Sequence, residues 1–305
     1  MSGPPQLFDR ALHRRRLARA AGGFAGAAFL KHRAAQDLVM RLEAVRRDFP
    51  IAADLGARNG AFGQALPLSD AAHKVGFLIE TDLALPMLAG RAGARLVADE
   101  ERLPFALESL DLVVSSLSLH WTNDFVGALI QIRQALKPDG LFLGAMLGGA
   151  TLTELRAALT TAELELFGGA GPRVSPFTDA FDAAALLQRA GFALPVTDVD
   201  RVTVRYANAV RLMADLRAMG ETSVLIEGPR RPLTRGLIAR AAEIYAQRFA
   251  EPDGRVLATF EIITLTGWAP HASQQRPLRP GSATTRLADA LGVRERSAGE
   301  RAGGN

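Results

Sequence analysis

The stretch IAADLGARNG, residues 51–60, predicts a short apolar strand that ends in an acid and opens into a glycine-bearing turn. A helix is expected next, over AFGQAL. Glycine is needed where a backbone turns sharply or where a ligand approaches the main chain closely. Asp54, at the strand end, can accept hydrogen bonds from a cationic amine or a ribose hydroxyl. Such a turn is common in strand–helix units, so this stretch alone is weak support for a nucleotide-type ligand.

Four more strands are predicted downstream, and the first two of them end in acids. The stretches are KVGFLIETDL (74–83), ARLVADEERLPF (94–105), SLDLVVSSLSLHW (109–121) and LKPDGLFLGAML (136–147), the last with an expected turn at 138–140 directly before its strand. Asp82 lies about two dozen residues past the glycine turn, which is the usual distance for a ribose-binding carboxylate at the end of the next strand. Asp99 ends the third strand in the same way.

The order of these elements predicts the fold class. Apolar residues at helical spacing in 125–136 indicate a helix between the fourth and fifth strands. Strands that alternate with helices over about 100 residues are typical of an α/β fold with a parallel, doubly wound sheet. Ligands on such sheets bind outside the carboxyl ends of the strands. The residues expected at that edge are Asp54, Asp82, Asp99 and Ser115-Ser116.

A set of short motifs resembles the seven-stranded S-adenosylmethionine-dependent methyltransferases. The motifs are DLGxxxG from Asp54, TDLxxxML from Thr81, DxExLPF from Asp99, LDLVxSxLxLHW from Leu110 and LKPDG from Leu136. The resemblance implies a Rossmann-like sheet of seven strands that binds S-adenosyl-L-methionine. A dehydrogenase fits less well, because the LPF and LHW segments have no place in it.

In that superfamily the acid-rich turn holds the methionine part of the cofactor, the second acid the ribose hydroxyls and the third acid the adenine amine. The cofactor-binding residues implied here are Asp54, Gly56, Arg58, Gly60, Asp82, Leu83, Asp99, Glu100 and Ser115. Arg58 departs from the superfamily's usual GxGxG loop, in which a glycine takes its place. The resemblance leaves two roles for its side chain, which either crowds the cofactor or pairs with the cofactor's carboxylate.

A closer resemblance, to the complex I assembly factor 5 group, covers nearly the whole chain. It is carried by FDRALHRRRLARAA, by SLHWTNDFVGALIQIRQALKPDGLFLGAMLGG, and by GPRVSPF, LMADLRAMGE, ATFEIITLTGW and RPGSA. Bacterial relatives of this group are often labelled with the biotin-pathway malonyl-carrier-protein methyltransferase. Its mitochondrial members are implicated in hydroxylating an arginine on a complex I subunit. The resemblance therefore implies a protein substrate, such as a complex I subunit, or a carrier-protein substrate.

Composition narrows the class of protein. The 305 residues suffice for one large α/β domain or two small ones. The net charge is +4 without any long block of like charges, so nucleic-acid binding is not expected. Cysteine is absent, which excludes disulfides, thiolate catalysis and thiolate-bound zinc. No apolar run has the length of a membrane span. We expect a bacterial cytoplasmic protein, and peripheral association with the inner face of the membrane stays open.

The second half of the chain predicts an insert and further elements of the same domain. Helices are expected over 150–166, 182–192, 208–220 and 231–250, strands over 196–206 and 256–268, and a turn-rich loop over 168–177. Methyltransferases of this type often insert a helical lid where the segment at about 150–180 lies. The arginine-rich FDRALHRRR is expected to form a helix over the cofactor site. We therefore expect a methyltransferase domain over 1–270 and a tail over 271–305, flexible past about residue 290.

His120, Trp121 and Arg173 are the candidate substrate contacts. His120 and Trp121 follow the fourth strand at the ligand edge, so they either face the ligands or form a pocket wall. Arg173, in GPRVSPF, either contacts an acidic or peptide substrate or forms a structural ion pair. The five histidines are scattered without a metal-binding spacing, so no metal site is expected.

No residue stands out as a general base, and none is assigned as catalytic. Methyl transfer from a sulfonium is an in-line displacement in which the cofactor supplies the reactive group, while the protein contributes alignment and a dry pocket. We therefore predict an S-adenosylmethionine-dependent methyltransferase. Two alternatives stay open: an assembly factor that hydroxylates an arginine of a complex I subunit, and a non-catalytic assembly chaperone that uses the cofactor as a structural ligand.

Overall fold

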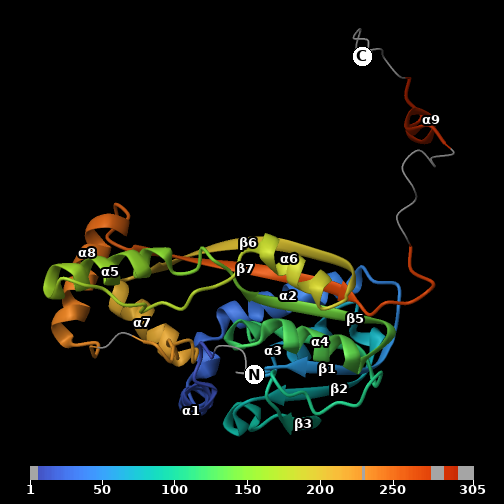
Figure 1. Cartoon of the computed structure of the whole chain (residues 1–305), viewed down its shortest axis with the longest axis horizontal. Coiled ribbons are helices and arrows are strands. Elements are labelled where there is room, and N and C mark those ends of the chain that lie inside the picture. Colours follow the sequence, from blue (N-terminus) through green and yellow to red (C-terminus); the bar gives the residue numbers. More distant parts are fainter. Residues whose placement is uncertain (1–5, 229–230, 276–284, 295–305) are drawn as a thin grey trace, which may run out of the picture. The chain divides into compact units, whose positions relative to one another are not determined.

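Seven strands form one mixed sheet in the order β3-β2-β1-β4-β5-β7-β6 (Figure 1). The computed structural model describes residues 6–228, 231–275 and 285–294. The strands are β1 Phe49–Leu55, β2 Val75–Asp82, β3 Ala94–Val97, β4 Leu110–Ser116, β5 Leu136–Leu147, β6 Ala193–Tyr206 and β7 Val256–Trp268. Strands β1 to β5 run parallel, whereas β7 is antiparallel to both β5 and β6. The predicted seven-stranded α/β sheet is confirmed.

Helices flank the sheet on both faces (Figure 1). The α-helices are α1 Arg10–Ala20, α2 Phe29–Glu43, α3 Ala61–Ala65, α4 Phe125–Ala135, α5 Thr153–Phe167, α6 Ala180–Arg189, α7 Ala209–Ala218, α8 Arg235–Phe249 and α9 Leu287–Leu291. Short 3-10 helices lie at Phe24–Ala27, Leu66–Leu68, Ala72–Lys74, Leu85–Leu88 and Leu119–Trp121. Side chains at several helix starts accept a backbone N–H of the first turn, as N-caps do: Asp9, Asp124, Asp179, Asn208 and Thr234. Within the described ranges, no helix combines the length and the apolarity that crossing a membrane requires.

Alternation along the strands divides the apolar side chains between two cores, because successive residues of a strand point to opposite faces. On one face, Val113 and Phe142 pack in a cluster with α4 and α6. On the other face, their neighbours Val114 and Leu143 belong to a cluster that includes α2, α3, α5, α7 and α8. Both faces of the central strands are therefore buried, as the long apolar runs of the sequence require.

The first long helix after the N-terminus, α2, was not among the predicted elements. Its buried stripe consists of Leu30, Ala34, Leu38 and Leu42, spaced four residues apart as on one face of an amphipathic helix. The helix contacts α3, β4 and β5. It therefore lies beside the loop that follows β1, where it can present a side chain to the predicted ligand edge.

The expected turn at 138–140 lies inside β5 rather than before it. Strand β5 begins at Leu136, and Asp139 adopts a left-handed φ of 62°. The pairing with β4 shifts its register between Leu110 and Leu112 at this level. Such a bulge accommodates an irregular residue without ending the strand. The prediction of a turn was wrong because Pro-Asp-Gly suits a bulge as well as a reversal of the chain.

Helix α5 packs against α8 and β7, and α8 lies with it at the same end of the molecule (Figure 1). Residues 256–261 of β7 extend past the pairing with β5, and β6 is the strand that they pair with. The segment 168–179 that follows α5 has no helix or strand. Together, α5 and this segment occupy the stretch in which the sequence predicts a lid.

The contacts within the chain divide it into two units, Met1–Pro270 and His271–Asn305. The first unit contains the sheet and helices α1 to α8, and the second contains α9. The prediction of a flexible end past about residue 290 concerns mostly 295–305, which lie outside the described residues.

Truncation of Phe142 should destabilise the protein by about 3–5 kcal/mol, as measured by denaturant unfolding of the Phe142→Ala variant. Its ring lies fully buried on β5, an interior strand of the sheet, and packs against Phe192 at a centroid distance of 5.5 Å. The matched control is Phe181→Ala on α6, because the Phe181 side chain is 84% exposed. This control should change stability by no more than about 0.5 kcal/mol. Equal losses of unfolding free energy in the two variants would contradict the assignment of Phe142 to the core.

Candidate functional site

The loop after β1 turns through three left-handed residues. Gly56, Arg58 and Gly60 have φ values of 66°, 54° and 70°. A Cβ on Gly56 would lie 2.0 Å from the hydroxyl oxygen of Ser118, so only glycine fits this close approach. At Arg58 the same region of φ is uncommon for a residue with a side chain. The loop therefore keeps the tight path of a glycine-rich turn while it carries a long cationic side chain.

The Arg58 side chain points into the protein and pairs with Asp82. The distance from Nη1 to the Asp82 carboxylate is 2.7 Å, and the two side chains are 1% and 0% exposed. The backbone N–H of Arg58 donates to the same carboxylate oxygen, and that of Ala84 donates to the other oxygen. The second terminal nitrogen of Arg58, Nη2, has no partner within the described residues. Asp82, the acid that the resemblance assigns to a ribose, is thus engaged by a cation of this chain.

Arg10, on α1, connects the next two acids. Its guanidinium donates to Asp99 over 2.6 Å and also to Glu100. Glu100 in addition accepts a hydrogen bond from the Ser118 hydroxyl. Burial alone would raise the pKa of Glu100, but the charges of Arg10 and Arg58 outweigh it and hold this pKa below its ordinary value. Glu100 is therefore ionised, and both acids after β3 are bound to α1.

Lys31, on α2, places a buried ammonium group at the loop. Its Nζ donates to the backbone carbonyl of Gly56 over 2.6 Å and to that of Ser116. Burial, which the charge of Asp54 opposes, lowers the pKa of Lys31 to about 8. Asp54 is itself fully buried, and neither of its carboxylate oxygens has a partner within the described residues. Burial raises the pKa of Asp54 to about 7.

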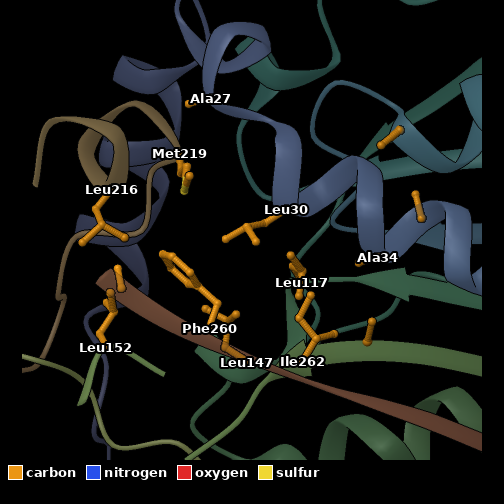
Figure 2. Close-up of a cluster of buried hydrophobic side chains, with 14 of the residues drawn as sticks. Ala27, Leu30, Ala34, Leu117, Leu147, Leu152, Leu216, Met219, Phe260 and Ile262 are labelled. Carbon is orange, nitrogen blue, oxygen red and sulfur yellow. The ribbon is translucent and has the colours of Figure 1, made fainter. Parts of the chain in front are cut away.

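A cavity of about 890 Å³ adjoins this loop. It shares Lys31, Arg58 and Leu117 with the ligand edge of the sheet, and most of the remaining wall is apolar. Figure 2 shows part of this wall, where Leu30 from α2 and Phe260 from β7 point toward a common space. The cavity has the size of a small-molecule site.

His120 and Trp121 both contact the carboxylate of Glu221, which follows α7 in the chain. His120 Nε2 lies 3.1 Å from a Glu221 oxygen, and the Trp121 indole N–H donates to the same oxygen over 2.9 Å. The ring of His13 lies against Trp121 at a centroid distance of 5.0 Å. Trp121 and Glu221 line the cavity. Trp121 therefore forms part of its wall, whereas His120 lies behind it, and Glu221 holds both side chains.

Arg173 also lies in the cavity wall, but its guanidinium is held by the protein. It donates to Glu163 on α5 over distances of 2.9 Å and 2.5 Å, and to the backbone carbonyl of Arg231 over 2.9 Å. Both charged side chains of the Arg173–Glu163 pair are largely buried. This arrangement is the structural ion pair that was the alternative to a substrate contact.

The remaining predicted residues lie close to the same edge. Ser115 is buried and donates its hydroxyl to the backbone carbonyl of Leu55. Leu83 packs with Leu17 of α1 in an apolar cluster. The Gly60 carbonyl accepts from the Arg91 side chain. All nine predicted cofactor-binding residues thus lie near the carboxyl ends of the strands. Several of them already form hydrogen bonds or ion pairs with other side chains of the protein.

The sequence is similar to two kinds of characterised protein. Residues 53–144 match the methyltransferase domain family. Over 290 residues the chain is 40% identical to the mitochondrial arginine-hydroxylase NDUFAF5 of Danio rerio, which covers 93% of this chain and 89% of that protein. Over 261 residues it is 41% identical to the Homo sapiens protein of the same name, with coverage of 84% and 74%. Over 292 residues it is 34% identical to the malonyl-acyl-carrier-protein O-methyltransferase of Methylovorus sp., with coverage of 91% and 95%.

The chain belongs to this methyltransferase-fold family. Solved structures agree on the fold. A putative methyltransferase from Bacillus halodurans has a TM-score of 0.53 and 16% identity, and covers 77% of this chain and 99% of that one. The YcgJ protein of a Bacillus species also has a TM-score of 0.53, with 14% identity and coverage of 78% and 98%. These similarities concern the sheet and its helices.

The family's cofactor, S-adenosylmethionine, fits the end of the site next to the cavity. Three polar groups there are buried without partners within the described residues, namely the Asp54 carboxylate, Arg58 Nη2 and the Ser116 hydroxyl. Buried polar groups are nearly always hydrogen-bonded, so these groups indicate that a polar ligand belongs beside them. At Asp82 and Asp99, by contrast, cofactor hydroxyls or an amine would have to share or replace the contacts of arginines.

The sequence predicted a helix with Arg10 over the cofactor site, but it indicated neither Lys31 nor Ser118, nor the contacts of Arg10 with Asp99 and Glu100. One signal for Lys31 was available, because a lysine flanked by Leu30 and spaced three residues from Ala34 lies on the apolar face of a helix. A cation on such a face has to find a buried acceptor. Across the described ranges, no three acidic, histidine or cysteine side chains gather in a way that could hold a metal ion.

Replacing Arg58 by glycine should tighten binding of S-adenosylhomocysteine, because it frees the Asp82 carboxylate and relieves the positive φ. The same change should lower the melting temperature of the ligand-free protein, since it leaves Asp82 buried without its guanidinium partner. Calorimetric titration and thermal unfolding measure the two effects. Arg33→Gly is the control, because Arg33 forms an exposed ion pair with Asp200. Weaker binding by Arg58→Gly would instead mean that Arg58 holds the ligand.

Replacing Asp54 by asparagine should stabilise the ligand-free protein more at pH 8 than at pH 5. The pKa of Asp54 is raised from its ordinary 3.8 to about 7. The unfolded chain therefore releases this proton first, and the wild type loses stability as the pH rises from about 4 to about 7. Asparagine removes that loss. Melting temperatures of both proteins across this range test the sign, and a stabilisation that shrinks toward pH 8 would contradict the raised pKa.

Proposed function

We propose that this chain binds S-adenosylmethionine at the loop after β1 and transfers a methyl group to an acceptor in the adjoining cavity. The observation that carries the proposal is the shared wall: Lys31, Arg58 and Leu117 belong both to the ligand edge and to the cavity. An acceptor in the cavity would therefore lie next to the reactive end of the cofactor. Such placement of two reactants is the main contribution that a protein makes to group transfer.

Several residues of the chain would hold the cofactor. Asp54, Lys31 and the Gly56 carbonyl lie where its amino-acid part fits, and Asp82 and Asp99 are the acids for its ribose and adenine. When bound, the cofactor supplies an electrophilic methyl group on a sulfonium. The apolar walls of the cavity would exclude water from the acceptor, while Glu221 would keep the Trp121 ring in place.

The charge of the cavity wall limits which charge the methyl acceptor can carry. Six cations reach the wall: Arg16, Arg19, Lys31, Arg58, Arg173 and Arg217. Among the described residues of the lining, Glu221 is the one acid. A guanidinium acceptor would meet like charges there, whereas a neutral or anionic acceptor would not. We therefore rank methyl transfer to a neutral or anionic group, such as a carboxylate, on a protein or carrier-protein substrate first.

The second candidate function is hydroxylation of an arginine on a complex I subunit, in an assembly role. It is favoured by the identity of about 40% to proteins named arginine-hydroxylase NDUFAF5, over 84–93% of this chain. Those proteins resemble the chain more than the carrier-protein methyltransferases do, at 32–34%. The third candidate function is a non-catalytic assembly chaperone with a bound cofactor, and an experiment has to distinguish it from the two enzymatic ones.

The proposal includes the organisation of the chain. Residues 1–270 would form the catalytic domain, with the segment at about 150–180 as a lid over the cavity and 271–305 as a tail. The protein would act in a bacterial cytoplasm, where a complex I subunit or an acyl carrier protein is within reach, and association with the inner face of the membrane would be peripheral.

Mass spectrometry of candidate substrates from a deletion strain should separate the candidate functions. Methyl transfer predicts the loss of about 14 Da from the substrate, and hydroxylation predicts the loss of about 16 Da from a complex I subunit. Biotin auxotrophy of the strain would identify a carrier-protein substrate. Failed assembly of complex I without any mass change would support the chaperone. Restoration by the wild-type gene, but not by an Asp82→Ala gene, controls for dependence on the cofactor site.

A further inference from the structure

One part of the cavity wall is built for an aliphatic ligand. Met219, Leu152 and Phe260 come from three separate segments and face one space (Figure 2). All three are buried, and Leu155 on α5 extends the same wall. Such a surface offers an S-adenosylmethionine molecule few of the hydrogen bonds that its polar groups need. It suits a chain of methylene groups, each of which contributes about 0.8 kcal/mol when it leaves water.

Three arginines stand together at this part of the cavity without acidic partners. Arg16 and Arg19 lie on α1, and Arg217 lies in the last turn of α7. Within the described residues none of the three takes part in an ion pair, although Arg16 donates to the backbone carbonyl of Ser223. Burial lowers the pKa of Arg16, and the positive charges of Arg19 and Arg217 lower it further. Their mutual repulsion would be relieved by an anion.

We infer that the cavity binds a long-chain acyl amphiphile, with its aliphatic chain between Leu155 and Phe260 and its anionic head group at Arg16, Arg19 and Arg217. The inference rests on the proposed function only where it makes this amphiphile the methyl acceptor: a carboxylate oxygen of the amphiphile would then form the O–CH3 bond while the S–CH3 bond of the cofactor breaks and S-adenosylhomocysteine leaves. Binding itself needs neither cofactor nor reaction. The pairing of apolar walls with unpaired guanidinium groups favours a carboxylate or phosphate amphiphile over an arginine-bearing peptide, whose own cation would be repelled.

Quenching of tryptophan fluorescence provides a direct test. The chain has two tryptophans, and Trp121 lines the cavity whereas Trp268 does not. In a Trp268→Phe protein the remaining emission reports on Trp121. Bromododecanoate, whose bromine quenches by contact, should quench this emission saturably. The uncharged bromododecanol should bind at least about tenfold more weakly, because it lacks the charge-assisted contacts with the arginines.

Variants on helix α1 and α7 separate the arginine cluster from general basic charge. In the Trp268→Phe background, Arg16→Gln, Arg19→Gln and Arg217→Gln together should weaken bromododecanoate binding at least about tenfold and leave bromododecanol binding unchanged. The matched control is Arg14→Gln with Arg15→Gln, because both residues are exposed on α1 and neither lines the cavity. Leu155→Phe, which fills the apolar wall, should weaken both ligands. Circular dichroism confirms that each variant is folded.

Each possible result of these experiments contradicts a different part of the inference. Equal affinity of the arginine variant and the control for bromododecanoate would overturn the head-group site, and absence of saturable quenching would overturn the acyl site altogether. Binding of the acyl anion without methylation of its carboxylate would keep this site and contradict only its role as acceptor. Methylation of a protein without any acyl binding would overturn the acyl site and leave the proposed methyl transfer standing. Free dodecanoate, and a dodecanedioyl thioester on an acyl carrier protein whose distal carboxylate stays free, then distinguish the two sources of the ligand.

Discussion

The carboxylates buried at the edge of the sheet require cations from elsewhere in the chain. Asp82 and Glu100 are almost completely shielded from water, and a buried charge without a partner is strongly destabilising. Arg58 neutralises the first acid from the loop, and Arg10 neutralises the second from α1. The tight loop, the placement of α1 over the site and the end of β4 all depend on this compensation.

The same pairing of acids with cations limits the free energy that a ligand can gain by binding at this edge. A glycine at position 58 would leave the edge open, whereas Arg58 fills it with a guanidinium that already uses the Asp82 carboxylate. A cofactor has to exchange contacts with groups that the protein has paired, and the net gain is the difference between two sets of charge-assisted hydrogen bonds. Within the described residues, the part of the site around Asp54 and Lys31 is different. A ligand can bind the unpartnered Asp54 carboxylate there without breaking an existing hydrogen bond.

The cavity connects this edge to the second half of the chain. Its walls combine α1 and α2 from the N-terminal part with α5, α7 and β7. Family relatives with different named activities share this fold, so the chemistry is set by the side chains that line the cavity. Here most of those side chains are apolar and six are cationic against the single acid Glu221 within the described lining, which is why the electrostatics favour an acceptor without a positive charge.

The sequence by itself determined the succession of strands along the chain, the glycine positions of the loop and the acids at strand ends. These features depend on local periodicity and turn chemistry, which a stretch such as 51–60 carries within itself. Only the tertiary structure decided which cation meets which acid. Arg10 and Asp99 are 89 residues apart in the chain, and Lys31 and Gly56 are 25 apart. Such pairs form because helices pack onto the sheet and remove the acids from water, and no local pattern encodes that geometry.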